Sequence, residues 1–216
     1  YDRNDALLEA DRRTYEERRA THRPYGRFGF DSPPLWLSVC VASLPDRRAW
    51  LDRLVDDLHN QAMELLLSGG HPLEVEVLVD DRPPLVTVGE KRQALLERAR
   101  GHFVAHVDDD DAVASDYLAR VVGAIRRRPD VDCCSRWGVR QVHDREEPFW
   151  ATILHERWSE SRVRLEDLQH ILQLREYSWA DLRRVEGVHL RTPGHLNAVR
   201  RTLALEVGFA RESHAE

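Results

Sequence analysis

Short apolar runs alternate with helical patterns through residues 35–125. The runs have the length and β-branched content of buried strands, and they cover residues 35–43, 75–79 and 102–107. Between and after them, apolar residues recur every three or four positions, as in helices with one buried face. The expected helices begin near Asp46, cover 89–100, and carry an apolar stripe from Tyr117 to Ile125. This order predicts a Rossmann-like α/β fold with a mostly parallel central sheet, flanking helices and right-handed crossovers.

The apolar stripe of the first helix is expected to face the core. It comprises Trp50, Leu51, Leu54, Val55 and Leu58. The pattern of the second half is weaker: 131–142 and 150–155 are expected to be extended, with a hairpin around HDREEP. Residues 165–174 are expected to be helical, and 201–207 to form a short helix that stops at Gly208.

Residues 1–34 form a separate, highly charged segment with few apolar positions. Seven arginines balance seven acidic residues there, which favours a solvated helical extension; an arm that binds nucleic acid is the alternative. The segment RPYGRFGFDSPP breaks this helix and leads into the core.

Composition narrows the function classes. With 42% hydrophobic and 32% charged residues the chain has a globular composition, and no apolar run is long enough to span a bilayer. The start YDRNDALLEADRR does not resemble a secretory signal, and three cysteines without a Cys-x-x-Cys pair indicate a reducing compartment and no structural zinc. We therefore expect a cytoplasmic protein, in the host cytoplasm if a phage encodes it. The net charge of −6 gives nucleic-acid binding no support.

Acidic residues follow two of the expected parallel strands. Asp80 and Asp81 end the second strand, and a run from Asp108 to Asp111 ends the third. Ligands of open α/β sheets bind at this carboxyl edge, where a hard cation such as Mn²⁺ or Mg²⁺ with substrate phosphates would offset carboxylate repulsion. If Asp108 ends its strand, alternation points Asp108 and Asp110 to one side. The alternative is that the run caps the next helix, through Asp111 or Ser115.

Two common nucleotide motifs are missing. The segment ASLPDRR after the first strand has no glycine, so it is not a dinucleotide-binding Gly-x-Gly-x-x-Gly turn, and no P-loop occurs.

The chain resembles the family 2 glycosyltransferases. The resemblance lies in SVCVASLPDRRAWLDRLVDDLHNQ, in EVEVLVDD, and in VGEKRQALLERARGHFVAHVDDDD with its Gly-x-Lys-Arg helix and Asp-x-Asp motif. The tail RTPGHLNAVRR resembles the Thr-Pro-x-His-Leu-Asn segment of a bacterial and phage subgroup. The resemblance implies the A-type glycosyltransferase (GT-A) fold over 35–216, with a nucleotide-binding half at 35–136. The acceptor half, 137–216, is expected to be incomplete at its carboxyl end.

The resemblance also implies roles for individual residues. The donor-binding set would be Ser43, Arg47, Asp80, Asp81, Lys91, Arg92 and Asp108, with Asp80 on the base or ribose and Lys91 and Arg92 near the diphosphate. Asp108 and Asp110 would hold the metal. The acceptor side would be Trp137, His195 and Asn197, and Glu216 or the residue after it would be the catalytic base. Each role has a structural alternative. Asp80 and Asp81 could form a turn, and Lys91 and Arg92 could lie on the surface, although Lys91 is the only lysine in the chain. His195 could be a buried structural residue, and Trp137 could belong to the core.

The implied activity is inverting, metal-dependent transfer of a sugar from a nucleoside-diphosphate sugar, expected to be a UDP-sugar, to an acceptor hydroxyl. A nucleotidyltransferase of similar architecture and a non-catalytic nucleotide-sugar-binding module are the alternatives. The acceptor stays open between a polysaccharide, a glycolipid and a modified DNA base, and so does the oligomeric state.

Overall fold

The structure is a computed structural model that describes residues 35–68, 74–134, 137–142, 145–151, 162–164, 187–191 and 193–209. The extension at 1–34, the helix expected over 165–174 and the proposed base Glu216 lie outside these ranges. Among the described residues, no helix is both long and apolar enough to cross a bilayer.

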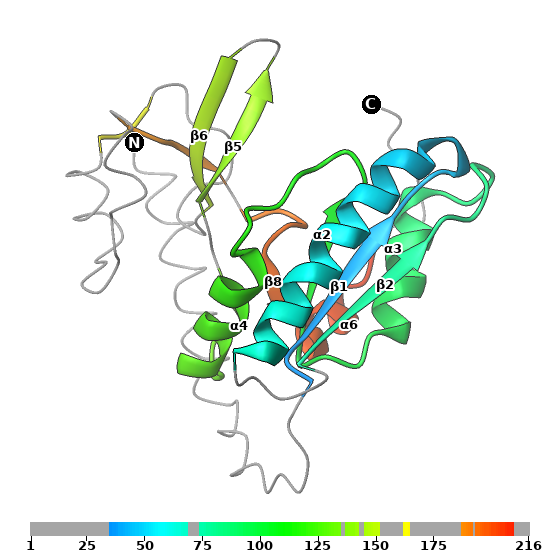
Figure 1. Cartoon of the computed structure of the whole chain (residues 1–216), viewed down its shortest axis with the longest axis horizontal. Helices are drawn as coiled ribbons and strands as arrows, with labels where there is room; N and C mark the ends of the chain where they lie inside the picture. Colours follow the sequence, from blue (N-terminus) through cyan, green and yellow to red (C-terminus); the bar gives the residue numbers. More distant parts are fainter. Residues whose placement is uncertain are drawn as a thin grey trace, which may run out of the picture. The chain divides into compact units, whose positions relative to one another are not determined.

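The chain alternates strands and helices as its apolar pattern predicts (Figure 1). The strands are β1 (Leu37–Ala42), β2 (Val75–Asp80), β3 (Phe103–Asp108), β4 (Cys133–Cys134), β5 (Trp137–Val142), β6 (Arg145–Ala151), β7 (His189–Arg191) and β8 (Ala198–Arg200). The helices are the 3₁₀ turn η1 (Pro45–Arg47), α2 (Arg48–Leu67), α3 (Val88–Arg98), α4 (Tyr117–Arg127) and α6 (Arg201–Val207).

A five-stranded sheet with the order β2-β1-β3-β8-β4 forms the centre of the fold. β1 pairs in parallel with β2 on one side and with β3 on the other. Only β8 runs against its neighbours, since it pairs antiparallel with both β3 and β4. The predicted α/β class with a mostly parallel sheet and flanking helices is confirmed.

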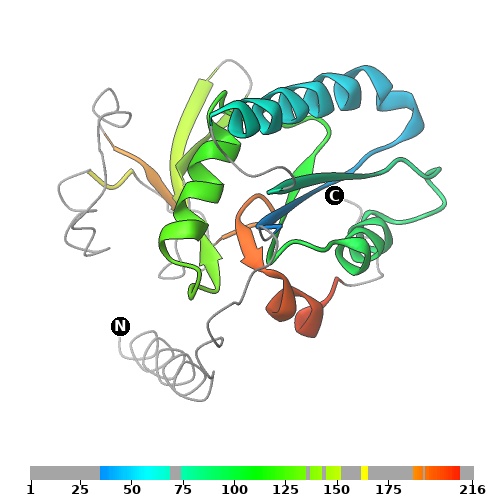
Figure 2. The ribbon, with the colours of Figure 1, turned by 60° about the horizontal axis from the view of Figure 1, so that its bottom comes forward.

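Alternating side chains of the central strands supply two separate cores. One face carries Val39, Val41, Ala105 and Val107, which pack with buried residues of α2 and α4. The other face carries Cys40 and Val104 and packs against α3, with Ala204 and Phe209 at its margin. Figure 2 shows the result: α2 and α4 lie on one side of the sheet and α6 on the other.

The helix stripes are confirmed with one exception. All five apolar residues predicted for α4 are buried, as are Leu51, Leu54 and Leu58 of α2. Trp50 belongs to the same predicted stripe but is 48% exposed. It lies at the start of α2, where the guanidinium of Arg47 stacks over its ring at 5.5 Å from the centroid. The buried face of the helix is therefore formed by leucines and does not include this tryptophan.

Three strands of the second half of the chain, β5, β6 and β7, form a smaller sheet of their own. β5 and β6 pair antiparallel, which confirms the expected hairpin, and β7 adds in parallel to β6. The short helix α6 ends at Gly208, whose φ of 67° suits a residue without a side chain. The sequence did not predict β8, because a strand of three residues is too short to give a periodic pattern.

Gly101 joins α3 to β3 where the chain passes close to β1. A Cβ at this position would lie 2.6 Å from Ser38 N and 2.8 Å from the carbonyl carbon of Leu37. The amide of Gly101 donates to Ser38 Oγ at 2.8 Å. A side chain here must therefore displace backbone of the central strand.

We expect Gly101→Ala to lower the free energy of unfolding by about 2 kcal/mol or more, since overpacking costs about 1–3 kcal/mol. Gly123→Ala is the matched control: its Cβ would meet only Arg127 Nη1, at 3.5 Å, within a helix. It should be neutral or stabilise by up to about 1 kcal/mol. Urea unfolding of both variants measures the difference, and equal stabilities would contradict the close approach.

Candidate functional site

The strand register places acidic residues on both sides of the end of β1. Ala42, the last residue of β1, is opposite Asp80 of β2 and Asp108 of β3. Because neighbouring strands lie about 4.8 Å apart, the Cα atoms of these two aspartates are about 10 Å apart. The carboxyl edge of the sheet, formed by Asp80, Asp108 and the loops that follow β1, β2 and β3, is thus acidic as predicted.

A tight turn brings three possible cation ligands together. The amide of Asp111 donates to the carbonyl of Asp108 at 3.0 Å, which closes a turn over these four aspartates. From the loop before β8, His195 Nε2 approaches Asp108 Oδ2 to 3.1 Å. Ligand atoms of Asp108, Asp111 and His195 all lie within 4.8 Å of one another. These three residues, which we name the ligand cluster, could hold one divalent cation.

The two middle aspartates of the turn contact Arg47. Asp109 is 2% exposed and accepts hydrogen bonds from Ser43 Oγ at 2.7 Å and Arg47 Nη1 at 2.9 Å. Asp110 is half exposed and lies 3.5 Å from the same nitrogen. Strand alternation does not extend to these residues, because β3 ends at Asp108 and a turn follows. The role of Asp110 as metal ligand stays a prediction, and the atoms that the structure gathers belong to Asp111.

The helix after this run is not capped by it. α4 begins at Tyr117 with Asp116 at its N-cap position, so neither Asp111 nor Ser115 occupies that position. The four aspartates therefore need another explanation than capping.

Asp108 is kept ionised by its neighbours. Burial alone would raise the pKa of its carboxyl group, but His195 and Arg92 together hold that pKa well below its usual range. Arg92 Nη2 donates to Asp108 Oδ1 at 2.6 Å. A carboxylate that stays charged under all ordinary conditions is suited to binding a cation.

A buried histidine lies behind the ligand cluster and was not singled out from the sequence. His106 is 4% exposed, its amide donates to the carbonyl of His195 at 2.9 Å, and its ring meets Phe209 edge-on at 4.8 Å. Burial, with the nearby charges of Arg92 and His195, lowers its pKa to about 3. A neutral ring therefore lies next to the loop that carries His195.

The side chain of Lys91 connects the loops that follow β1 and β2. Its side chain is 1% exposed, and Nζ donates to the carbonyls of Ser43 at 2.5 Å and Arg82 at 2.6 Å. Burial lowers its pKa, while Asp80 opposes that effect. A capping box between Thr87 and Glu90 fixes the start of α3 just before it. The amine thus connects these two loops; direct contact with a diphosphate stays a prediction.

The carboxylate of Asp80 is engaged by a neighbour in the chain. Arg82 Nε donates to Asp80 Oδ1 at 2.8 Å and Arg82 Nη2 to Oδ2 at 2.6 Å. Burial would raise the pKa of Asp80, and these hydrogen bonds lower it overall. Asp81 is exposed and lies 3.6 Å from Arg48 Nη1. A base or ribose that bound Asp80 would have to share its oxygens with Arg82.

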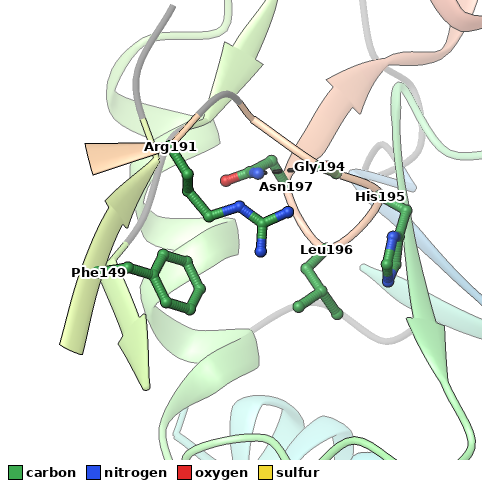
Figure 3. A pocket seen from close by; sticks show the side chains of 6 residues that line it. All are labelled: Phe149, Arg191, Gly194, His195, Leu196 and Asn197. Atoms are coloured by element: carbon green, nitrogen blue, oxygen red, sulfur yellow. Dashed lines mark hydrogen bonds between the residues drawn. The ribbon is translucent and has the colours of Figure 1, made fainter. Parts of the chain in front are cut away.

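A pocket adjoins the ligand cluster, with which it shares His195 (Figure 3). It is lined by Phe149, Arg191, Gly194, His195, Leu196 and Asn197. The sequence predicted His195 and Asn197 on the acceptor side, and both line this pocket. Trp137, predicted with them, is described only as backbone, in β5 opposite Trp150. Phe149 and Arg191 gave no signal in the sequence, because β6 and β7 bring them together over a long chain distance.

Residues 86–177 match the family model described as Glycosyl transferase family 2. The match covers less than half of the chain, so the chain is similar to this family over that range. The family 2 match includes α3, β3 and α4, and hence Lys91, Arg92 and the turn that follows β3.

The chain is also similar to solved structures of S. aureus TarS. TarS 1–349 has 16% sequence identity and a TM-score of 0.45, over 82% of this chain and 51% of that one. Its complex with UDP-GlcNAc has 16% identity and a TM-score of 0.42, over 80% and 47% of the two chains. Its complex with UDP has 16% identity and a TM-score of 0.45, over 83% and 52%. The chain thus spans about half the length of the TarS 1–349 structures it matches. None of the curated proteins matches its sequence.

We expect Lys91→Met to lower the free energy of unfolding by about 2 kcal/mol or more, because a buried acceptor left without its donor costs about 1–3 kcal/mol. Arg98→Met, on the exposed side of the same helix, is the control and should stay within about 0.5 kcal/mol of the wild type. Chemical unfolding in the absence of ligand measures both. If Lys91→Met unfolds like the wild type, the amine is not a structural tie between the two loops.

Proposed function

We propose that this chain carries the catalytic domain of a metal-dependent, inverting glycosyltransferase that uses a nucleoside-diphosphate sugar, with UDP as the nucleotide. One observation carries the proposal: in a chain that matches the family 2 model over 86–177, the ligand cluster lies at the carboxyl edge of the parallel strands. This edge is where open α/β sheets bind ligands. The whole range 35–216 is proposed to form this domain, in the cytoplasm, with 1–34 as an extension.

The ligand cluster fits a divalent cation chemically. Two carboxylates and one imidazole suit Mn²⁺, and they also accept Mg²⁺ if water and phosphate oxygens complete its shell. A cation bound there would stabilise the negative charge that develops on the departing nucleoside diphosphate. We propose Asp108, Asp111 and His195 as its protein ligands, with the predicted Asp110 as the alternative to Asp111.

The donor is proposed to bind over β1 and β2. Ser43 and Arg47 follow β1 there, Lys91 of α3 connects the loops after β1 and β2, and Asp80 with Asp81 would contact the base or ribose. Arg92 donates to Asp108 through Nη2, while its buried Nε has no hydrogen-bond partner within the described residues. We propose that this guanidinium also contacts the diphosphate.

Transfer is proposed to occur in one displacement. The acceptor hydroxyl gives its proton to a carboxylate base, attacks the anomeric carbon, and the nucleoside diphosphate leaves from the opposite face. Such base assistance contributes about 10²–10⁴-fold to the rate. Glu216, or the residue after it, is the proposed base. His195, Asn197 and Trp137 are proposed to face the acceptor, which stays open among polysaccharide, glycolipid and modified DNA base.

Binding of Mn²⁺ and UDP tests the site separately from turnover. Isothermal titration of UDP with and without Mn²⁺ should show that the metal strengthens binding to the wild-type chain. Asp108→Asn, Asp111→Asn and His195→Gln should each weaken the metal-dependent part about ten-fold or more, because even indirect partners of metal ligands contribute about 10–100-fold.

Asp110→Asn is the matched control in the same turn, and it should reduce binding less than Asp111→Asn. The reverse order would assign the metal to Asp108 and Asp110. Undiminished metal-dependent binding in Asp108→Asn would contradict the proposed site altogether. A panel of nucleotide sugars, scored by release of the nucleotide, then tests transfer itself.

A further inference from the structure

In the pocket of Figure 3, the positively charged guanidinium of Arg191 is held in a defined position. The guanidinium carbon of Arg191 lies 5.1 Å from the centroid of the Phe149 ring, a stacking distance for a cation on an aromatic face. In Figure 3 the guanidinium extends between this ring and the loop that carries Gly194 and Leu196. A Cβ on Gly194 would lie 3.0 Å from Arg191 Nη2, so the glycine leaves the space that the guanidinium fills.

Charges of both signs act on Arg191. Burial and the positive charge of Arg140 lower the pKa of Arg191, and Asp111 opposes them. A negative group that entered the pocket would be attracted by both arginines. Asp111, in turn, connects the pocket electrostatically to the ligand cluster, and His195 belongs to both.

The same pocket contains an oriented hydrogen-bond acceptor. Asn197 is 4% exposed, and its Nδ2 donates to the carbonyl of Gly194 at 3.2 Å. That bond fixes the amide orientation and leaves Oδ1 buried without a partner among the described residues. A buried acceptor without a donor is unfavourable, which a ligand hydroxyl would relieve.

We propose that this pocket binds the acceptor substrate through an oxyanion, a phosphate or carboxylate, that has a hydroxyl group beside it. Arg191 donates to the oxyanion, and Asn197 Oδ1 accepts from the hydroxyl. The inference rests on the proposed function, since it places the acceptor on the β6–β7 side of the ligand cluster and the donor on the β1–β2 side. It narrows the acceptor to a molecule that carries negative charge near the hydroxyl that is glycosylated.

Small probes of this chemistry test the proposal directly. With Mn²⁺ present, and both with and without saturating UDP, sn-glycerol 3-phosphate and glucuronate are titrated against the chain, with glycerol as the neutral control. At least one anionic probe should bind with higher affinity than glycerol. Arg191→Met should weaken that binding about ten-fold or more, the size of one lost charge-assisted hydrogen bond. Arg191→Lys should fall between, and Asn197→Ala should weaken binding of the hydroxylated anions but not of inorganic phosphate.

Arg127→Met, an exposed arginine of α4, is the matched control and should bind every probe like the wild type. Equal binding of the anions by wild type and Arg191→Met would overturn the proposal, as would the absence of anion binding to the wild type. If Arg191→Met instead loses UDP, the pocket serves the diphosphate of the donor and the acceptor assignment is wrong. Failure of the wild type to bind UDP at all is a separate result, which contradicts the proposed function and not this pocket chemistry, because the probes are also titrated without UDP.

Discussion

Electrostatic repulsion at the carboxyl edge is the constraint on which the rest of the structure depends. Six aspartates end or follow β2 and β3, and the parallel register brings both strand ends next to the end of β1. Carboxylates gathered in this way are unfavourable unless cations compensate them. The chain supplies such cations locally: Arg82 for Asp80, Arg48 for Asp81, and Arg47 for the middle of the Asp run. Arg92 does the same for Asp108, which together with Asp111 and His195 gathers three possible ligand atoms within 4.8 Å; this arrangement is the basis for proposing a metal ion.

Buried hydrogen bonds hold the acidic edge in place. Ser43 connects β1 to the turn after β3 through Asp109, and Lys91 connects the loops after β1 and β2 through their carbonyls. These contacts come from three different elements, so the position of one loop depends on the others. A rigid arrangement of this kind keeps charged groups oriented before a substrate arrives, which is the condition for electrostatic stabilisation of a transition state.

The sequence predicted the parts of the fold that rest on periodicity. Continuous apolar runs predicted β1 and β3, the five-residue stripe predicted α4, and the strand ends predicted where the acidic residues would meet. The resemblance singled out His195 for the acceptor side, and the structure places its ring beside Asp108. Turn geometry, in contrast, was beyond the pattern: alternation paired Asp108 with Asp110, but the hydrogen bond from Asp111 to Asp108 brings together the first and last residues of the run.

Burial of polar side chains and long-range pairing were also beyond what the sequence pattern could predict. As the only lysine of the chain, Lys91 was predicted to have a functional role. A helical pattern does not reveal that its amine donates to the carbonyls of two loops. Trp50 fitted the apolar stripe of α2 but stacks with Arg47 at the exposed start of the helix. Phe149 and Arg191 meet only because β7 adds to β6, and no local pattern predicts such a pairing.

The central claim is that Asp108, Asp111 and His195 jointly bind one metal ion. Crystals grown with Mn²⁺ and UDP, measured at the manganese absorption edge, test it most directly through an anomalous difference map. We expect one peak bonded to both carboxylates and to His195 Nε2, with diphosphate oxygens completing the coordination. A manganese peak bonded elsewhere, or bound UDP with no metal beside Asp108, would contradict it.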